Sequence, residues 1–265
     1  SKGRAIQNLV NIEQDDRVKA FICTQDLKDE DYINNHFVIM ATKKGQVKKT
    51  SLEKYSRPRA NGINAITNRE DDELLEAKLT NGKSQILLAV KSGKAIRFEE
   101  SKTRPMGRGA SGVRGIKLRG PDAVVGMSIL RHVNYQEVPN SDLHEREVYL
   151  RQTSYLRRVT NETTENEIDQ PDVMLSPERL AFLGAAEDFI LTVTENGIGK
   201  RTSAYEYRIT NRGGQGIWNI DVTDRAGSVV AGFPVNHSDQ IMLVTNSGQL
   251  IRCAVDEIGI TAVSY

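Results

Sequence analysis

The chain has 265 residues, of which 38% are hydrophobic and 27% charged, and its formal net charge is +1. This apolar fraction is low for a globular domain, which favours a β-rich repeat with a large surface over a thick-cored α/β enzyme. No apolar run approaches the roughly 20 residues that a membrane-spanning helix needs. The two cysteines lie far apart and the four histidines show no metal-ligand spacing, so we expect reduced thiols and no zinc site.

In chain order, the first expected elements are two strands, over residues 6–12 and 17–24, that form half of a repeating unit. Four copies of one phrase follow. Each copy is an apolar, β-branched run, a polar residue with glycine, and a basic residue four positions after the glycine. Because polar–Gly pairs supply the positive φ of a tight turn, each copy predicts a β-hairpin. The glycines are Gly45, Gly93, Gly197 and Gly248, and the basic residues are Lys49, Arg97, Arg201 and Arg252.

Two further strands complete each expected unit. A second glycine, followed by a β-branched residue, opens one of them at Gly62, Gly112 and Gly216, and a last apolar strand lies within residues 71–79, 121–130 and 224–235. Four strands in about 50 residues are typical of a propeller blade. Three whole units and two halves make about four blades. They fit a ring closed by both chain ends, and they also fit a truncated part of a larger ring.

The second and third hairpins lie about two periods apart, and residues 132–188 separate them. This stretch is acidic and polar and lacks the repeated phrase. We interpret it as an insertion within a single domain spanning 1–265, with a degenerate blade as the alternative. Near its end, residues 176–189 predict a short helix that has Ser176 as its N-cap and Pro177 at its first position.

Charge is segregated along the chain. Residues 43–119 contain 19 Lys and Arg against 8 Asp and Glu, whereas residues 120–190 contain 6 against 13. A basic region within a neutral protein is the electrostatic footprint of a nucleic-acid-binding surface. The alternative for the repeated cations is protection of edge strands against aggregation. Lys49 shares a strand face with Val47, so its direction stays open at this point.

Residues 41–50, 92–118, 196–217 and 239–258, together with 68–79, resemble the C-terminal domain of the A subunit of bacterial DNA gyrase, a type IIA topoisomerase. The resemblance implies an all-β β-pinwheel of four-stranded blades, usually six, in which neighbouring blades exchange a strand. It also implies that the domain bends and wraps double-stranded DNA around a basic perimeter, so that gyrase introduces negative supercoils in an ATP-dependent strand-passage reaction. The corresponding C-terminal domain of topoisomerase IV, which steers substrate choice, is the alternative within the same family.

The gyrase family has a seven-residue box, Gln-Arg-Arg-Gly-Gly-Lys-Gly, which this sequence lacks in its full form. A degenerate copy consists of Asn211, Arg212, Gly213, Gly214, Gln215 and Gly216, and weaker echoes occupy residues 57–62 and 107–112. Glycines in such loops allow backbone N–H groups to approach phosphates closely. We expect the loss of the full box to impair DNA wrapping more than DNA binding.

Cations spaced around a rigid disc would contact phosphates and position DNA without reading its sequence. The candidate DNA-binding residues are Lys48, Lys49, Arg57, Arg59, Lys94, Arg97, Lys102, Arg104, Arg108, Arg114, Lys200, Arg201, Arg212 and Arg252. The resemblance further implies no cofactor in this domain, with ATP and Mg²⁺ used by the rest of the enzyme. It implies as partners the other gyrase domains and the second type of gyrase polypeptide in an A2B2 complex, in the bacterial cytoplasm and away from membranes.

The sequence gives weaker support to two other classes of function, an enzyme and a protein-interaction propeller. An enzyme with its site in the central channel would need a catalytic constellation, and the sequence shows no nucleophile setting and no phosphate-binding loop. The family's DNA-cleaving tyrosine belongs to another domain. A protein-interaction propeller would use exposed aromatic patches, but the chain is only 6% aromatic and Trp218 is its one tryptophan.

Overall fold

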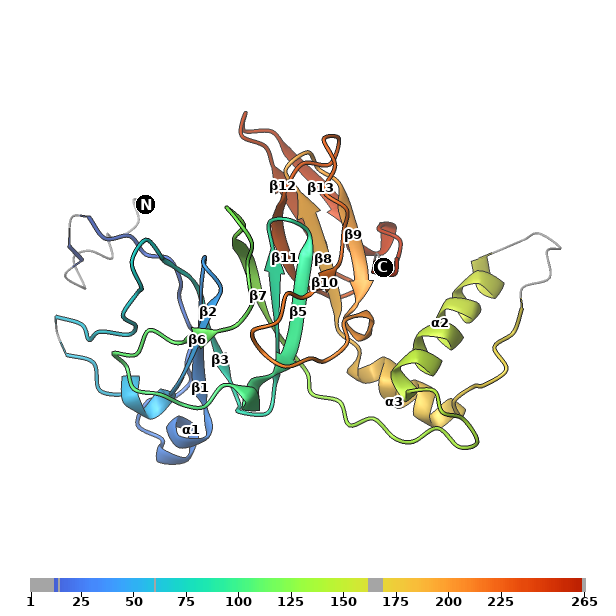
Figure 1. Cartoon of the computed structure of the whole chain (residues 1–265), viewed down its shortest axis with the longest axis horizontal. Coiled ribbons are helices and arrows are strands. Elements are labelled where there is room, and N and C mark those ends of the chain that lie inside the picture. Colours follow the sequence, from blue (N-terminus) through green and yellow to red (C-terminus); the bar gives the residue numbers. More distant parts are fainter. Residues whose placement is uncertain (1–11, 14, 60, 162–168, 264–265) are drawn as a thin grey trace.

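The computed structural model describes residues 12–13, 15–59, 61–161 and 169–263. The strands of this part form four antiparallel sheets, which we name blades 1 to 4 in chain order (Figure 1). Strands β3, β7 and β11 are neighbours from blade to blade, and the first three blades stack on one another through them. Blades 1 and 2 are four-stranded, as the 50-residue repeat predicts, whereas blade 3 has three strands and blade 4 has two within the described residues.

The strand bounds follow the predicted hairpins closely. Blade 1 contains β1 (Phe37–Thr42), β2 (Gln46–Ser51), β3 (Leu74–Thr80) and β6 (Val113–Arg114). Blade 2 contains β4 (Gln85–Val90), β5 (Lys94–Glu99), β7 (Val124–Leu130) and β10 (Ile217–Trp218). Blade 3 contains β8 (Phe189–Thr194), β9 (Gly199–Ser203) and β11 (Val229–Val235), and blade 4 contains β12 (Gln240–Val244) and β13 (Leu250–Ala254).

Each hairpin turns at the glycine of the repeated phrase. Gly45, Gly93, Gly197 and Gly248 have φ values of 84°, 93°, 81° and 83°. This left-handed conformation carries little steric cost only for glycine, which explains why the turn recurs with the same residue. A short 3-10 helix follows each return strand: η2 (Leu52–Tyr55), η3 (Glu100–Lys102), η4 (Ala204–Glu206) and η5 (Val255–Glu257).

The outer strand of a blade comes from the next unit of the sequence. Strand β6 follows the hairpin of blade 2 but pairs with β2 of blade 1, where Val113 lies opposite Val47. Strand β10 follows the hairpin of blade 3 but pairs with β5 of blade 2, where Ile217 lies opposite Ala95. Neighbouring blades are thus interlocked, which is the strand exchange that the resemblance implies.

The core lies between the blades. One apolar cluster joins Ile39 of blade 1 to Leu88 and Phe98 of blade 2, and further clusters join blades 2 and 3 and blades 3 and 4. Because blades 2 and 3 have a neighbour on each side, β4 and β8 are buried along their whole length and read as continuous apolar runs. Strand β12 has a neighbour on one face only, so its more buried and more exposed residues alternate.

Two of the expected strands are wrong. Residues 17–24 and 62–66 contain no strand. Their local pattern is apolar enough, but a strand also needs a hydrogen-bonded partner, and strand propensity depends strongly on that context. The expected strand over residues 6–12 falls almost entirely outside the described residues.

Two helices lie between β7 and β8 and project from the side of the pinwheel: α2 (Glu145–Asn161) and α3 (Pro177–Ala186) (Figure 1). A shorter helix, α1 (Glu30–Asn35), precedes β1. The predicted start of α3 is confirmed, since Ser176 accepts a hydrogen bond from the backbone N–H of Arg179 and Pro177 opens the helix. The sequence reasoning missed α2, which carries four arginines and two glutamates.

The helix pair is attached firmly to blade 3. The hydroxyl of Tyr149 on α2 donates a hydrogen bond to Glu187 (2.6 Å), which also accepts one from Ser203 of β9 (2.5 Å). Leu183 of α3 packs against Tyr149 and Tyr205 in one buried cluster. Burial raises the pKa of Glu187.

Candidate nucleic-acid interface

Three of the four repeated cations do not face solvent. The exposed fractions of Lys49, Arg97 and Arg201 are 4%, 1% and 5%, and that of the neighbouring Lys48 is 1%. The prediction that these side chains lie on a basic rim is therefore wrong. The stacking of one sheet on the next, together with the loops around it, covers them.

The repeated cations instead mark a joint between consecutive blades. The carbonyl of Lys49 accepts a hydrogen bond from the backbone N–H of Met106 (2.8 Å), which lies just beyond η3 of blade 2. The carbonyls of Arg97 and Arg201 accept the equivalent bonds from Thr210 and Thr261, each at 2.9 Å. We call this arrangement the interblade joint. It occurs three times in the described chain, once after each of blades 1, 2 and 3.

The side chains complete the joints with different partners. The ammonium of Lys49 lies 3.2 Å from the carboxylate of Glu100, a fully buried residue of η3, and 4.3 Å from the ring centre of Phe37. Thr80 donates a further hydrogen bond to the same carboxylate. A buried charge is tolerated when it is paired and hydrogen-bonded in this way.

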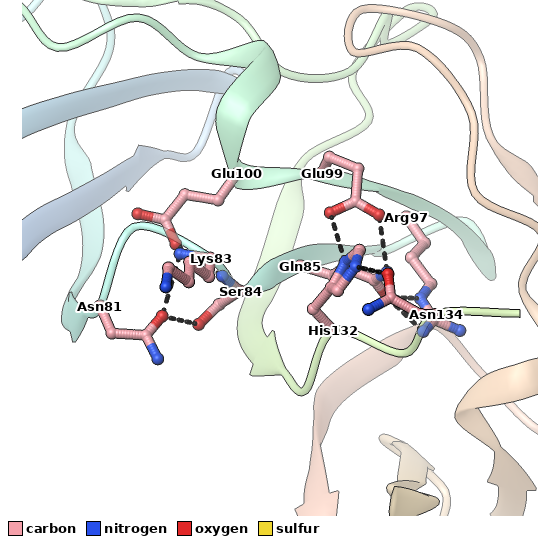
Figure 2. Close-up of polar contacts among 9 residues, drawn as sticks. All are labelled: Asn81, Lys83, Ser84, Gln85, Arg97, Glu99, Glu100, His132 and Asn134. Atoms are coloured by element: carbon pink, nitrogen blue, oxygen red, sulfur yellow. Dashed lines mark hydrogen bonds and ion pairs between the residues drawn. The ribbon is translucent and has the colours of Figure 1, made fainter. Parts of the chain in front are cut away.

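Arg97 forms the second joint without an acidic partner. Its Nε donates to the side-chain oxygen of Gln85 (2.7 Å), and another guanidinium nitrogen donates to the carbonyl of Ala204 in η4 (2.5 Å). Figure 2 shows that the hydrogen bond between Arg97 and Gln85 is the start of a chain of polar contacts. The side chain of Gln85 donates a hydrogen bond to Glu99, and Glu99 in turn contacts His132. Burial lowers the pKa of Arg97.

The third copy has a histidine as its side-chain partner, and the fourth differs because the stack ends. Arg201 lies 3.0 Å from the imidazole Nδ1 of His237. Arg252 is exposed, since blade 4 has no neighbour on its outer face within the described chain. The periodic cation is thus a signal of blade stacking, and its direction depends on whether a further blade covers it.

Lys48 holds two loops together. Its ammonium donates hydrogen bonds to the carbonyls of Ala65 and Arg108, and it lies 3.4 Å from the hydroxyl of Tyr55. Burial, with a smaller contribution from the positive charge of Arg108, lowers the pKa of Lys48 to about 8. This lysine therefore connects two loops within the protein and is not available at the surface.

Half of the candidate cations that remain accessible lie on the loops that follow the first three 3-10 helices. We call these segments, residues 56–63, 103–112 and 207–216, the outer loops; Ala60, in the first echo of the box, lies outside the described residues. Of the predicted contacts, Arg57, Arg59, Lys102, Arg104, Arg114 and Arg252 are exposed, and Lys94, Arg108, Lys200 and Arg212 are half-buried. The structure thus brings most of these cations to the outer side of blades 1 and 2.

The degenerate box packs against the preceding outer strand. Gly213 donates its N–H to the carbonyl of Gly115 (2.7 Å), and the guanidinium of Arg212 donates to the carbonyls of Arg114 (2.7 Å) and Lys102 (3.2 Å). Gly216 has a φ of 75°, and a Cβ there would lie 2.5 Å from the carbonyl oxygen of Ala95. The box therefore fixes the third outer loop to β6 and to the end of η3.

Sequence reasoning missed a second group of cations because they do not repeat with the blades. Lys43, Lys44, Arg69 and Lys117 line a cleft of about 900 Å³ near the first hairpin, together with the acidic residues 70–73 and Asp122. Lys43 is paired with Glu73, so the charge of this cleft is mixed. Arg114 of β6 also lines this cleft, which therefore adjoins the outer strand of blade 1.

Within the described residues, no cluster of three or more His, Cys, Asp or Glu could hold a metal ion. None of the described helices is long and apolar enough to cross a membrane.

The family model for the DNA gyrase C-terminal domain, a beta-propeller, matches residues 36–81, 85–131, 188–236 and 239–262. These four segments correspond to blades 1 to 4 and leave out the two-helix segment. The chain belongs to the DNA gyrase A C-terminal domain family. The predicted membership of this family is thus confirmed.

Similar full-length proteins are DNA gyrase A subunits. The chain is 38% identical to the protein of Rickettsia prowazekii over 98% of its own length, 39% identical to that of Granulibacter bethesdensis over 100%, and 36% identical to that of Staphylococcus aureus over 97%. It spans only 28%, 29% and 23% of these relatives.

Two solved structures share the fold. The C-terminal domain of DNA topoisomerase IV superposes with a TM-score of 0.70 at 20% identity, covering 98% of this chain and 64% of that one. A DNA gyrase A C-terminal domain superposes with a TM-score of 0.67 at 19% identity, covering 99% and 69%. At these sequence identities the structural similarity is evidence for the fold alone, and it confirms the predicted β-pinwheel.

Proposed function

We propose that this domain binds double-stranded DNA without sequence preference and bends it along the outer loops. The observation that carries the proposal is the gathering of exposed cations on the outer loops of successive, rigidly joined blades. Arg57 and Arg59 lie on the first loop, and Lys102, which ends η3, and Arg104 lie at the start of the second. DNA that follows the rim would meet one cationic loop per blade.

The energetics require several such contacts at once. Bending 20–30 base pairs by 40–90° costs on the order of 1–6 kcal/mol, and each cation that neutralises a phosphate releases counterions that favour binding. The interblade joints keep the loops at fixed spacing, so little conformational entropy is lost when DNA binds. Rigid, repeated phosphate contacts suit bending without sequence readout.

For the whole protein we propose the role of a gyrase A subunit. The wrapped segment would be passed through a second one in an ATP-dependent reaction that introduces negative supercoils in the bacterial cytoplasm. The cleavage and ATPase sites, with Mg²⁺, would lie in the other gyrase domains and in the second type of gyrase polypeptide, joined as A2B2. Residues 1–265 would form a single pinwheel domain, interrupted by the insertion at 132–188.

The test is a charge reversal on the outer loops with a matched control. One variant carries Arg57→Glu, Arg59→Glu, Lys102→Glu and Arg104→Glu. The control reverses four exposed cations outside the outer loops, at Lys28, Lys83, Lys91 and Arg225. Both variants have the same net charge, so a difference between them reports the position of the cations rather than their number.

Binding to a linear duplex would be measured by gel shift at several salt concentrations. We expect the loop variant to lose at least about 100-fold in affinity and the slope of log K against log salt to become shallower by about 3 to 4, since each lost phosphate contact contributes about 0.9. We expect the control to lose less than about 10-fold. Equal losses in the two variants, or no binding by the unaltered chain, would contradict the proposal. Ligation of relaxed circles in the presence of the domain would then report whether the bound DNA is wrapped.

A further inference from the structure

Trp218 is the chain's only tryptophan, and it stands at the rim. It is the last residue of β10, the outermost strand of blade 2, and 45% of it is exposed. A large aromatic side chain left this open at a sheet edge costs solvation free energy that burial would recover. At this edge the ring offers an apolar face and an indole N–H that a partner can contact.

The backbone around Trp218 is fixed from two blades. In register, Trp218 lies opposite Lys94 of β5, and the next residue, Asn219, donates its N–H to the carbonyl of Gly93 (2.9 Å). The side chain of Asn219 donates to Thr192 of blade 3 (2.7 Å). The backbone that carries the indole is thus held in place before any partner arrives, which lowers the entropic cost of using it for binding.

The surroundings of the indole are cationic. The ammonium of Lys94 lies 4.6 Å from the ring centre, and that of Lys200 donates to the carbonyl of Asn219. Burial lowers the pKa of Lys200. Arg212 belongs to the outer loop that leads into β10. Glu206 and Asp221 lie near Lys200, so the cation that contacts the ring is Lys94, and an ammonium beside an exposed ring suits a polyanion better than an apolar protein surface.

The equivalent position in blade 1 strengthens the assignment. Lys94 directly follows the turn glycine of blade 2, and Gln46 directly follows that of blade 1. Gln46 lies opposite Arg114, so Arg114 occupies in blade 1 the position that Trp218 occupies in blade 2. The rim thus presents a cation on one blade and an aromatic ring on the next at the same place.

Building on the proposed DNA binding, we propose that Trp218 is a direct DNA contact that packs its exposed ring against the deoxyribose edge of the minor groove. Proteins that bend DNA frequently place apolar side chains in the minor groove. The contact involves no phosphate charge, so it adds affinity without releasing counterions. The sugar contact on blade 2 would then alternate with the phosphate contact of Arg114 on blade 1.

The single tryptophan gives a direct readout on the unaltered chain. Its fluorescence would be followed while an unlabelled linear duplex is added. We expect a saturable change in intensity or emission maximum with the same midpoint as the gel shift. An unchanged spectrum at saturating DNA would overturn the inference while leaving the proposed function intact.

Substitutions of Trp218 distinguish an apolar contact of the ring from a charged contact with a phosphate. We expect Trp218→Ala to weaken binding about 10-fold with an unchanged salt slope, and Trp218→Phe to keep most of the affinity. Trp218→Arg should restore affinity at low salt and steepen the slope by about 0.9, as a new phosphate contact would. The matched control is Phe182→Ala, which removes another exposed aromatic residue, on α3.

The outcomes are distinguishable. If the Ala variant binds DNA like the unaltered chain, the ring serves another partner, such as a protein. This outcome contradicts the inference about Trp218 and leaves the proposed function intact. A lower salt slope in the Ala variant shows that the tryptophan only positions Lys94, and likewise contradicts it. A chain that binds no duplex at all contradicts the proposed function together with this inference.

Discussion

Arg97 shows why a regularly repeated cation need not face a ligand. Its guanidinium is desolvated, which disfavours the charged form, but it gains hydrogen bonds to Gln85 and to a carbonyl of η4. A longer side chain with several donors can therefore tie one blade to the next where an apolar residue could not. The repeat reflects this structural demand, and most of the exposed cations proposed to contact DNA lie on the outer loops or within two residues of their ends instead.

Replacing Arg97 by alanine should separate stability from binding. We expect Arg97→Ala to lower the free energy of unfolding by about 3 kcal/mol, because it removes a large buried side chain and leaves Gln85 without its donor. The exposed Arg104→Ala should change stability by less than about 0.5 kcal/mol. Urea unfolding curves of both variants would check this, and equal midpoints would show that Arg97 does not stabilise the joint.

Lys48 should give the protein a measurable pH dependence. Its pKa is lowered to about 8 in the folded chain, from 10.5. Between these two values the unfolded chain binds the proton and the folded chain has released it. Stability from this group therefore rises as pH increases from about 8 to 10.5. In unfolding curves taken over this range, Lys48→Met should rise less steeply with pH than the unaltered chain, whereas parallel curves would contradict the assignment.

At the scale of elements, the exchanged outer strands depend on glycines that allow close approach. Gly112 and Gly216 precede β6 and β10, and a Cβ at either would lie 2.5 Å from a backbone oxygen of the strand with which β6 or β10 pairs. Gly62 has a similar φ, but nothing lies within 4 Å of its Cβ position. The same sequence signal thus marks a tight contact in two places and an open loop in the third.

Alanine at these glycines should reveal the difference. We expect Gly216→Ala to cost more than about 2 kcal/mol, from the positive φ together with the clash against Ala95, and Gly62→Ala to cost only about 1 kcal/mol. Thermal unfolding would measure both. The fluorescence of Trp218, two residues further on, should shift in the Gly216 variant alone. Similar losses at both sites would show that close approach contributes nothing.

At the scale of the whole molecule, blade 4 presents an uncovered apolar face. Met242, Val244 and Leu250 are between 59% and 67% exposed and share the face of β12 and β13 that points away from blade 3, whereas the exposed Ile251 lies opposite Leu243 on the other face. In blades 2 and 3 the equivalent face is covered by the following blade. Contiguous exposed apolar area of this kind drives association.

The 265-residue chain should therefore self-associate as its concentration rises. We expect the apparent mass in sedimentation equilibrium to increase with protein concentration, and Met242→Lys with Leu250→Lys to abolish the increase. A control that places two lysines at Val18 and Phe182, which are also exposed, should behave like the unaltered chain. A concentration-independent mass for the unaltered chain would count against this role of blade 4.

The sequence by itself determined the features that depend on local backbone chemistry. The hairpins follow from glycines that adopt positive φ at Gly45, Gly93, Gly197 and Gly248, and the start of α3 follows from Ser176 and Pro177. The period of about 50 residues and the basic stretch of 43–119 pointed to the blades and to the loop cations. Each of these signals lies within a few residues of the structure it specifies.

Only the tertiary structure decided where the side chains point. Lys49, Arg97 and Arg201 are buried because a following blade covers them, whereas Arg252 carries the same motif and is exposed because none does. Residues 17–24 look like a strand and form none, since pairing depends on a neighbour that is distant in sequence. The rim position of Trp218 likewise arises from strand exchange, which pairs it with Lys94, far away along the chain, in one sheet.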